Sequence, residues 1–195
     1  MDVSFQLYGE NMQDSLQEND RDFREEVERR SGQHTVECYQ CGNCTAGCPF
    51  NFAYDIPVSK IMRLVQLGQR ETVLSCHSIW LCASCQTCTT RCPNSIDVAK
   101  VMDVLRHMAR EAGYVSERKV EAFGESFLAS VKRNGRLHEL GVALGYEMRT
   151  GHFLTDIDLA PAMIGKGKLT LKPHHIHGTD QVAGIFKRFQ ESNHE

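Results

Sequence analysis

The stretch CYQCGNCTAGCP, residues 38–49, and its near copy CASCQTCTTRCP, residues 82–93, decide the fold expected of this chain. Each stretch places four cysteines at the same intervals and follows the last one with proline. A thiol at every third residue wraps a loop around one compact centre, which is how a cubane iron–sulfur cluster is held. Two such stretches in one chain predict two [4Fe–4S] clusters.

The fourth cysteine of each stretch has a particular partner in the bacterial pattern C-x2-C-x2-C-x3-C-P. There it binds the cluster of the other loop. By this rule we expect the first cluster to be bound by Cys38, Cys41, Cys44 and Cys92. The second cluster would be bound by Cys82, Cys85, Cys88 and Cys48. Crossed ligation of this kind makes each loop depend on the other and keeps the two clusters close enough for an electron to pass between them.

Other uses of these cysteines fit the spacing less well. Structural zinc usually takes two paired C-x2-C knuckles, whereas three cysteines at equal steps plus a trailing Cys-Pro do not form two pairs. A radical-SAM cluster uses the spacing C-x3-C-x2-C. The ninth cysteine, Cys76, stands six residues before Cys82 and is interpreted as a small buried hydrophobe. Trp80, between them, is expected to pack over the second cluster and shield it from water.

From Cys38 onward the chain repeats itself. The cysteine loops are 44 residues apart, whereas IPVSKIMRLV at 56–65 and IDVAKVMDVL at 96–105 are 40 residues apart. The difference is a four-residue insertion after Cys48, around Asn51 to Tyr54. Internal repetition predicts two related half-sites, each a cysteine loop followed by a helix.

The helix of each half can be placed from its end signals. In the first half a helix opens at Pro57 and runs to Gly68, and in the second half Asp97 caps a helix that stops near Gly113. Apolar residues recur at helical spacing in both and are expected to face the core. They are Val58, Ile61, Met62 and Val65 in the first half and Val98, Val101, Met102, Leu105 and Met108 in the second.

Helical arms flank the duplicated segment. Residues 15–30 predict a solvated, charged helix that ends at Gly32, and β signals are nearly absent apart from LTL at 169–171. Three later stretches predict amphipathic helices, and the apolar face of the last one is expected to point inward. Their apolar stripes are Val120, Phe123, Phe127 and Val131; Leu137, Leu140, Leu144 and Met148; and Val182, Ile185, Phe186 and Phe189.

These patterns together predict a mainly α protein in three parts. We expect an N-terminal extension at 1–33, an α-helical ferredoxin-like domain with two [4Fe–4S] clusters at 34–115, and a C-terminal helical arm for partner docking at 116–195. The helices after each cysteine loop distinguish this domain from the β-hairpin ferredoxins.

Composition excludes several classes of function. The net charge is −3 and Lys and Arg are scattered, so no nucleic-acid surface is expected. No apolar run reaches the roughly 18 residues of a membrane span, and the polar N-terminal region carries no export signal, so a cytoplasmic location is expected. The histidine-rich PHHIHG at 173–178 is interpreted as an exposed or partner-binding loop. No dinucleotide fingerprint, phosphate loop or zinc-protease motif is present. The chain alone should therefore carry electrons and catalyse nothing.

The two cysteine stretches, the helix after each and the chain length resemble the C subunit of heterodisulfide reductase. The resemblance is specific over about residues 34–115 and weak over both arms. It implies an electron relay from the flavin-containing A subunit to the B subunit, which reduces the disulfide of coenzyme M and coenzyme B or a related one. It also implies a role in methanogenesis and flavin-based electron bifurcation, with a hydrogenase or formate dehydrogenase in the wider assembly. The CCG motif of the disulfide-cleaving B subunit is absent, so the chain resembles the separate C subunit.

The competing interpretation is an iron–sulfur electron-transfer subunit of another anaerobic reductase or dehydrogenase. Iron–sulfur subunits of fumarate reductase share the helical cluster domain, but they add an N-terminal [2Fe–2S] domain with its own cysteines, and residues 1–33 contain none. Subunits of glycolate oxidase or glycerol-3-phosphate dehydrogenase usually carry CCG repeats as well. Both alternatives keep the electron-transfer role and change only the partners.

Overall fold

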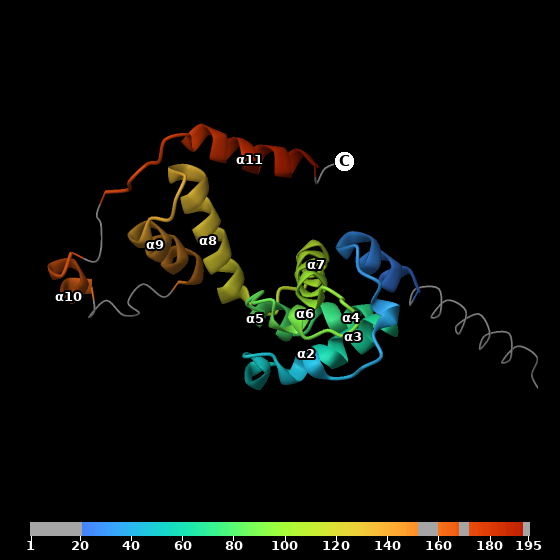
Figure 1. The fold of residues 1–195 in the computed structure, drawn as a ribbon. Helices are drawn as coiled ribbons and strands as arrows, with labels where there is room; N and C mark the ends of the chain where they lie inside the picture. Colours follow the sequence, from blue (N-terminus) through green and yellow to red (C-terminus); the bar gives the residue numbers. More distant parts are fainter. Residues whose placement is uncertain (1–20, 152–159, 168–171, 193–195) are drawn as a thin grey trace, which may run out of the picture. The chain divides into compact units, whose positions relative to one another are not determined.

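The computed structural model describes residues 21–151, 160–167 and 172–192, and these are mainly helical with no β-strand among them (Figure 1). The predicted fold class is confirmed. The chain divides into two compact units, Met1–Glu117 and Arg118–Glu195. The LTL stretch at 169–171 lies outside the described residues.

The first described helix of this unit runs through residues 21–31 and ends where Gly32 adopts a left-handed backbone with φ +63°. Residues 15–20 of the predicted helix lie outside the described residues. The charges of this helix predicted that it would be solvated, but one face is buried: Phe23 and Val27 are 1% and 0% exposed. The carboxylate of Glu28 then accepts hydrogen bonds from Thr35 Oγ1 and Val36 N at 2.8 and 3.1 Å, which fixes the turn η1 (Thr35–Glu37) before the first cysteine.

The first half contains the short helix α2 (Asn43–Ala46), the turn η2 (Asn51–Ala53), and the helices α3 (Val58–Gln66) and α4 (Arg70–Leu74). Pro57 stands immediately before α3 with φ −60° and ψ 149°, and Gly68 follows the helix in a left-handed conformation. All four apolar residues expected to face the core from α3 are buried. The predicted helix and its buried face are therefore confirmed.

The second half contains the short helices α5 (Ser78–Leu81) and α6 (Thr87–Thr90) and the longer α7 (Val98–Glu111). The Asp97 side chain caps α7 by accepting from Lys100 N at 3.0 Å, as predicted. The five apolar residues assigned to its inner face are all buried. Helices α4, α5 and α6 all contact α7, which lies beside them in Figure 1.

The two cysteine loops are fastened to their helices in the same way. Thr45 Oγ1 accepts from Ser59 N at 2.9 Å, and its counterpart Thr89 Oγ1 accepts from Ala99 N at 3.2 Å. A left-handed backbone also recurs at equivalent loop positions, and such turns make backbone N–H groups converge on an anion. These residues are Gln40 and Gly42 in the first loop and Ser84 and Gln86 in the second. The duplication seen in sequence is thus a duplication of geometry.

The second unit contains α8 (Arg118–Asn134), α9 (Glu139–Thr150), α10 (Ala160–Gly165) and α11 (Thr179–Ser192). Helix α8 contacts both α9 and α11. The face that α8 buries is polar and consists of Ser126, Ser130 and Asn134. A methyl group added at Gly145 of α9 would lie 3.4 Å from Ser126 Oγ, so small residues allow the two helices to approach closely.

The apolar stripes expected on these helices are largely exposed. Phe123 is 53% exposed, Met148 is 74% exposed, and Ile185 and Phe189 are 57% and 56% exposed. The prediction that the α11 stripe points inward is therefore wrong for Ile185 and Phe189. Helical spacing identifies an apolar face but not what covers it. Within the described ranges, no helix joins enough length to enough apolar character to cross a bilayer.

Candidate metal centre

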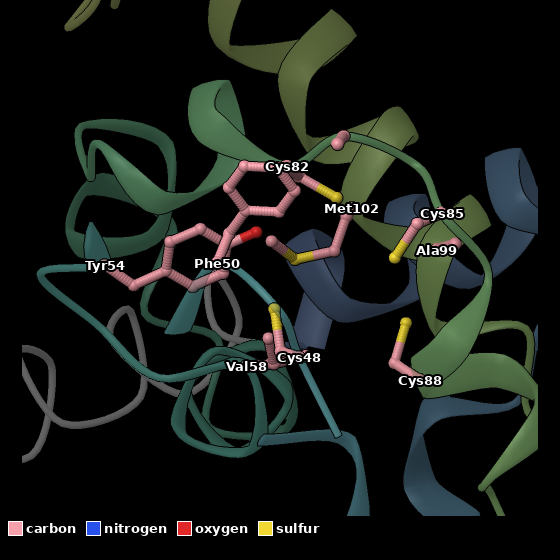
Figure 2. Close-up of a pocket in the computed structure, with 10 residues that line it drawn as sticks. Cys48, Phe50, Tyr54, Val58, Cys82, Cys85, Cys88, Ala99 and Met102 are labelled. Atoms are coloured by element: carbon pink, nitrogen blue, oxygen red, sulfur yellow. The ribbon is translucent and has the colours of Figure 1, made fainter. Parts of the chain in front are cut away.

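Two cavities in the first unit are lined by cysteine side chains. We call them the first and second thiol cavities, and they are similar in size. The thiols of the first cavity belong to Cys38, Cys41, Cys44 and Cys92. Those of the second belong to Cys48, Cys82, Cys85 and Cys88. Each cavity thus brings together three thiols from one loop and one from the other, and Figure 2 shows the four sulfurs of the second cavity facing a common space.

The helices supply matching walls to the two cavities. Met62 of α3 lines the first cavity and its counterpart Met102 of α7 lines the second. The two valines are exchanged between the halves. Val98 of α7 lines the first cavity, and Val58 of α3 lines the second. The two sites are therefore related by an approximate twofold exchange of the halves, and the walls between thiols are mostly apolar.

One side chain from each helix also fixes the loop at its first cysteine. Gln66 Nε2 of α3 donates to the carbonyl oxygens of Thr35 and Cys38 at 2.8 and 2.9 Å. At the equivalent place on α7, the Arg106 guanidinium donates to the carbonyls of Ile79 and Cys82 at 2.9 and 2.7 Å. The contacts are equivalent, but one is made by a neutral amide and the other by a cation.

Burial separates the thiols within each loop. Burial raises the pKa of Cys88 to about 11, although hydrogen bonds from Thr89 work in the other direction, and it also raises the pKa of the equivalent Cys44. Cys41 and Cys85 are exposed, and hydrogen bonds from Thr87 lower the pKa of Cys85. A thiol must lose its proton before it binds a metal, and burial makes this loss less favourable. The free energy of metal binding offsets that cost.

Two tyrosines direct their hydroxyl groups at these sulfurs. Tyr54, from the inserted segment, lines the second cavity with its hydroxyl pointing toward the sulfurs (Figure 2) and hydrogen-bonds to Cys48 and Cys82. Burial, together with these neighbouring sulfurs, raises the pKa of Tyr54. Tyr39 makes a comparable bond to Cys41 from an exposed position. Each phenol can donate a hydrogen bond to the sulfur atoms that it contacts.

The geometry of these thiols fits a polynuclear cluster. Within the described residues, no three histidine, cysteine or carboxylate side chains are arranged to hold a single metal ion. Four thiols nevertheless surround each cavity. Four thiols at each cavity are the ligand number of a cubane cluster with one thiolate at each iron.

Comparison with known proteins agrees with this geometry. Residues 37–97 match the model of a 4Fe-4S dicluster domain. Over 97 residues the chain is 30% identical to the C subunit of the H(2):CoB-CoM heterodisulfide,ferredoxin reductase of Methanothermobacter thermautotrophicus, covering 50% of this chain and 52% of that protein. It is 30% identical over 121 residues to the C subunit of the ferredoxin/F(420)H(2)-dependent CoB-CoM heterodisulfide reductase of Methanosarcina acetivorans, covering 58% of this chain and 74% of that protein. The chain belongs to the family of heterodisulfide reductase C subunits.

A third family member shows how far the likeness extends. The second iron-sulfur C subunit of the CoB--CoM heterodisulfide reductase of Methanocaldococcus jannaschii is 34% identical over 110 residues, which is 55% of this chain and 59% of that protein. The chain spans about half the length of most of these relatives. As a member of this family it binds [4Fe–4S] clusters and has an iron–sulfur electron-transfer role.

The structure also places the side chains that the sequence left outside the ligand sets. Cys76 is buried, 3% exposed, and lines neither cavity, which agrees with a structural role.

Trp80 was expected to pack over the second cluster, but it does not line the second cavity. It lies in the core, where its Nε1 has no hydrogen-bond partner among the described residues. Phe50 and Tyr54 line that cavity instead. The insertion after Cys48 was visible in sequence, but the destination of Tyr54 was not. His174, His175 and His177 are exposed.

Proposed function

We propose that this chain is the electron-transfer subunit of a heterodisulfide reductase complex and that it holds two [4Fe–4S] clusters, one in each thiol cavity. The observation that carries the proposal is the grouping of eight cysteines around two equal cavities within residues 38–92. The proposed ligands of each cluster are the four thiols of its cavity. When bound, each cluster supplies a one-electron redox centre.

The chain's own residues bind the clusters, orient the loops and limit access of water. The threonine bonds to the helix N-termini and the clamps from Gln66 and Arg106 hold the loops in place. Met62 and Met102 provide apolar walls that lower the local dielectric around the sulfurs. Rigid loops reduce the reorganisation that accompanies electron transfer.

The proposed route runs from the flavin-containing A subunit to the B subunit, which reduces the disulfide of coenzyme M and coenzyme B or a related one. The names of the relatives support such a complex, since each relative belongs to a CoB-CoM heterodisulfide reductase. We place the complex in the cytoplasm, with a hydrogenase or formate dehydrogenase as its electron source. The proposed process is methanogenesis or a related metabolism that uses flavin-based electron bifurcation.

We further propose that residues 116–195 dock the partner proteins, as a part distinct from the cluster domain at 34–115 and the extension at 1–33. The exposed apolar residues of the second unit support this role, since large apolar patches on a protein surface mark interaction sites. Replacing Phe123 and Phe127 with serine should release the partner proteins while leaving the iron content unchanged. Loss of iron together with the partners would contradict a purely docking role.

Anaerobic purification with iron and sulfide analysis tests the cluster assignment. About eight irons and eight sulfides per chain are expected from two [4Fe–4S] clusters. Mass spectrometry should find a flavoprotein and a CCG-motif protein in the purified complex. A colourless, zinc-containing chain without sulfide would refute the proposal.

Two cysteine variants test the crossed ligand sets. Cys48→Ser should disturb the EPR signal of the cluster held by Cys82, Cys85 and Cys88, and Cys92→Ser should disturb the other. The opposite pattern would mean that each loop supplies all four ligands to its own cluster.

A further inference from the structure

The two thiol cavities are alike in size and solvent exposure, which often make the reduction potentials of two clusters differ. They are similar in size, and each has one exposed thiol, Cys41 or Cys85. Solvent access, which shifts the potential of a cluster, is therefore similar at the two sites. Any difference in potential must come from the groups that contact the loops.

Neutral hydrogen-bond donors are also balanced. In the first cavity Gln40 Nε2 lies 3.3 Å from Cys38 Sγ, and Tyr39 hydrogen-bonds to Cys41. In the second cavity Tyr54 hydrogen-bonds to two sulfurs, and Thr87 Oγ1 lies 3.4 Å from Cys85 Sγ. Donors of this kind stabilise the more negative, reduced cluster. Thr45 at Cys44 and Thr89 at Cys88 add an equivalent pair, so similar groups serve both sites and do not distinguish the cavities strongly.

Formal charge does distinguish them. The Arg106 guanidinium is positively charged and contacts the backbone of the second loop, where its Nη2 donates to the Cys82 carbonyl oxygen at 2.7 Å. The equivalent Gln66 touches the Cys38 carbonyl as a neutral amide. Among the described residues no carboxylate pairs with Arg106, and its side chain is only partly exposed, so little of its charge is neutralised locally. A nearby cation favours the state with the extra electron.

Two exposed charges act in the opposite sense and are weaker. Arg63 donates to Gln66 Oε1 at 3.1 Å, one contact removed from the first loop, and Asp103 precedes Arg106 by one helical turn. Both are solvent-exposed, where water and salt screen their fields. Arg91, which precedes Cys92 and packs against Gly47 beside Cys48, is also exposed and adjoins both ligand sets, so it does not favour one cavity. The partly buried Arg106, in direct contact with the loop, therefore dominates.

Resting on the proposed function, we infer that Arg106 is a positioning and potential-setting residue. It gives the cluster held by Cys48, Cys82, Cys85 and Cys88 a higher reduction potential than the other. The first electron to enter the chain rests on this cluster, and an electron arriving at the first cavity passes downhill to the second. The duplication therefore provides two similar sites. The difference between Gln66 in the first half and Arg106 in the second gives electron transfer between the clusters its direction.

The natural test exchanges the two residues. Arg106→Gln should lower the midpoint potential of the second cavity's cluster, and Gln66→Arg should raise that of the first, so either change narrows the gap. The double exchange should reverse the order of reduction. Midpoints are measured by EPR-monitored redox titration of the full chain with both clusters present. Tyr54→Phe, which alters only the second cavity, identifies the signal of that cluster.

Controls separate charge from structural damage. Arg106→Lys keeps the charge and should leave the order of reduction unchanged, whereas Arg63→Gln should shift the midpoints less than either exchange. If Arg106→Gln loses iron, Gln66→Arg decides, because it adds charge without removing the second clamp. Unchanged midpoints, an equal shift of both, or a wild type whose first cavity has the higher potential would overturn the inference. A wild-type chain without iron and sulfide would instead refute the proposed function.

Discussion

Replacing Asp55 with alanine should loosen the segment that leads into the second thiol cavity. The Asp55 carboxylate accepts from His77 N and Ser78 N, each at 3.0 Å, and from Ser78 Oγ at 2.5 Å. It also accepts from Ile56 N at 2.9 Å. Asp55 thus satisfies the first N–H groups of α5, whose last residue precedes Cys82, and it fixes the backbone directly after Tyr54.

The size of the effect follows from these contacts. Removing a carboxylate that satisfies the N–H groups at a helix N-terminus costs about 0.5–2 kcal/mol. Bonds to a charged group reach about 1.5–3 kcal/mol where they are buried, but Asp55 is exposed and water replaces part of the loss. We therefore expect Asp55→Ala to cost about 1–2 kcal/mol, which is about a 5- to 30-fold rise in the population of the opened α5 segment.

Hydrogen exchange measured by mass spectrometry tests this estimate. Amides at 77–81 should exchange about 5- to 30-fold faster in the variant, because local opening exposes them in proportion to its population. Amides at 58–66 in α3 should keep their protection. Asp103→Ala, which removes an exposed aspartate on α7, is the matched control and should leave 77–81 unchanged. Equal exchange at 77–81 in wild type and Asp55→Ala would refute the proposed role of these bonds.

The effect should also depend on pH with a definite sign. Partial burial of Asp55 opposes its charged form, but hydrogen bonds from Ser78, His77 and Ile56 outweigh this and hold its pKa below the ordinary value. A carboxyl whose folded pKa is lowered stabilises the fold fully above its unfolded pKa of about 4 and loses that contribution as pH falls through the folded value. The difference in protection between wild type and variant should therefore shrink below about pH 4. A gap that widens in acid would contradict this account.

Three further outcomes are expected. Leu105→Ala removes a fully buried side chain and should lower the free energy of unfolding by about 2–5 kcal/mol, whereas Leu128→Ala, at a half-exposed position, should cost far less in the same denaturant titration. Glu26→Gln breaks ion pairs with Arg30 and Arg70 at 2.7 and 2.8 Å on the surface, so it should cost less than about 1 kcal/mol, and the cost should fall further in roughly 1 M salt. Chelating the iron of the loaded chain should increase hydrogen exchange across 38–92 much more than across 118–150, because the metal stabilises only the fold that binds it.

The elements whose causes are local could be predicted from the sequence. Asp97 caps α7 and Gly68 follows α3 because capping and left-handed backbone depend on neighbouring residues. The burial of Met62 and Met102 followed from helical spacing in the same way. The predictions at these positions match the structure in both halves because the repeat presents the same local sequence pattern twice.

Features that depend on distant partners could not be predicted. Helical spacing marked Phe123 and Ile185 as apolar positions, but burial depends on what packs against them, and α8 instead buries Ser126 against α9. Trp80 is closer to a cysteine in sequence than Tyr54 is, two residues from Cys82 against six from Cys48, yet only Tyr54 lines the second cavity. The path of the inserted segment, fixed by Asp55, decides which aromatic ring reaches the sulfurs.

The exchange of one thiol between the loops has a consequence for the assembly of the two sites. Each cavity takes three thiols from one half and one from the other, so neither half alone encloses four. A shorter polypeptide with a single half could complete a four-thiol cavity only by pairing with a second copy of itself. Two such halves joined in one chain supply each other's fourth thiol without a second molecule.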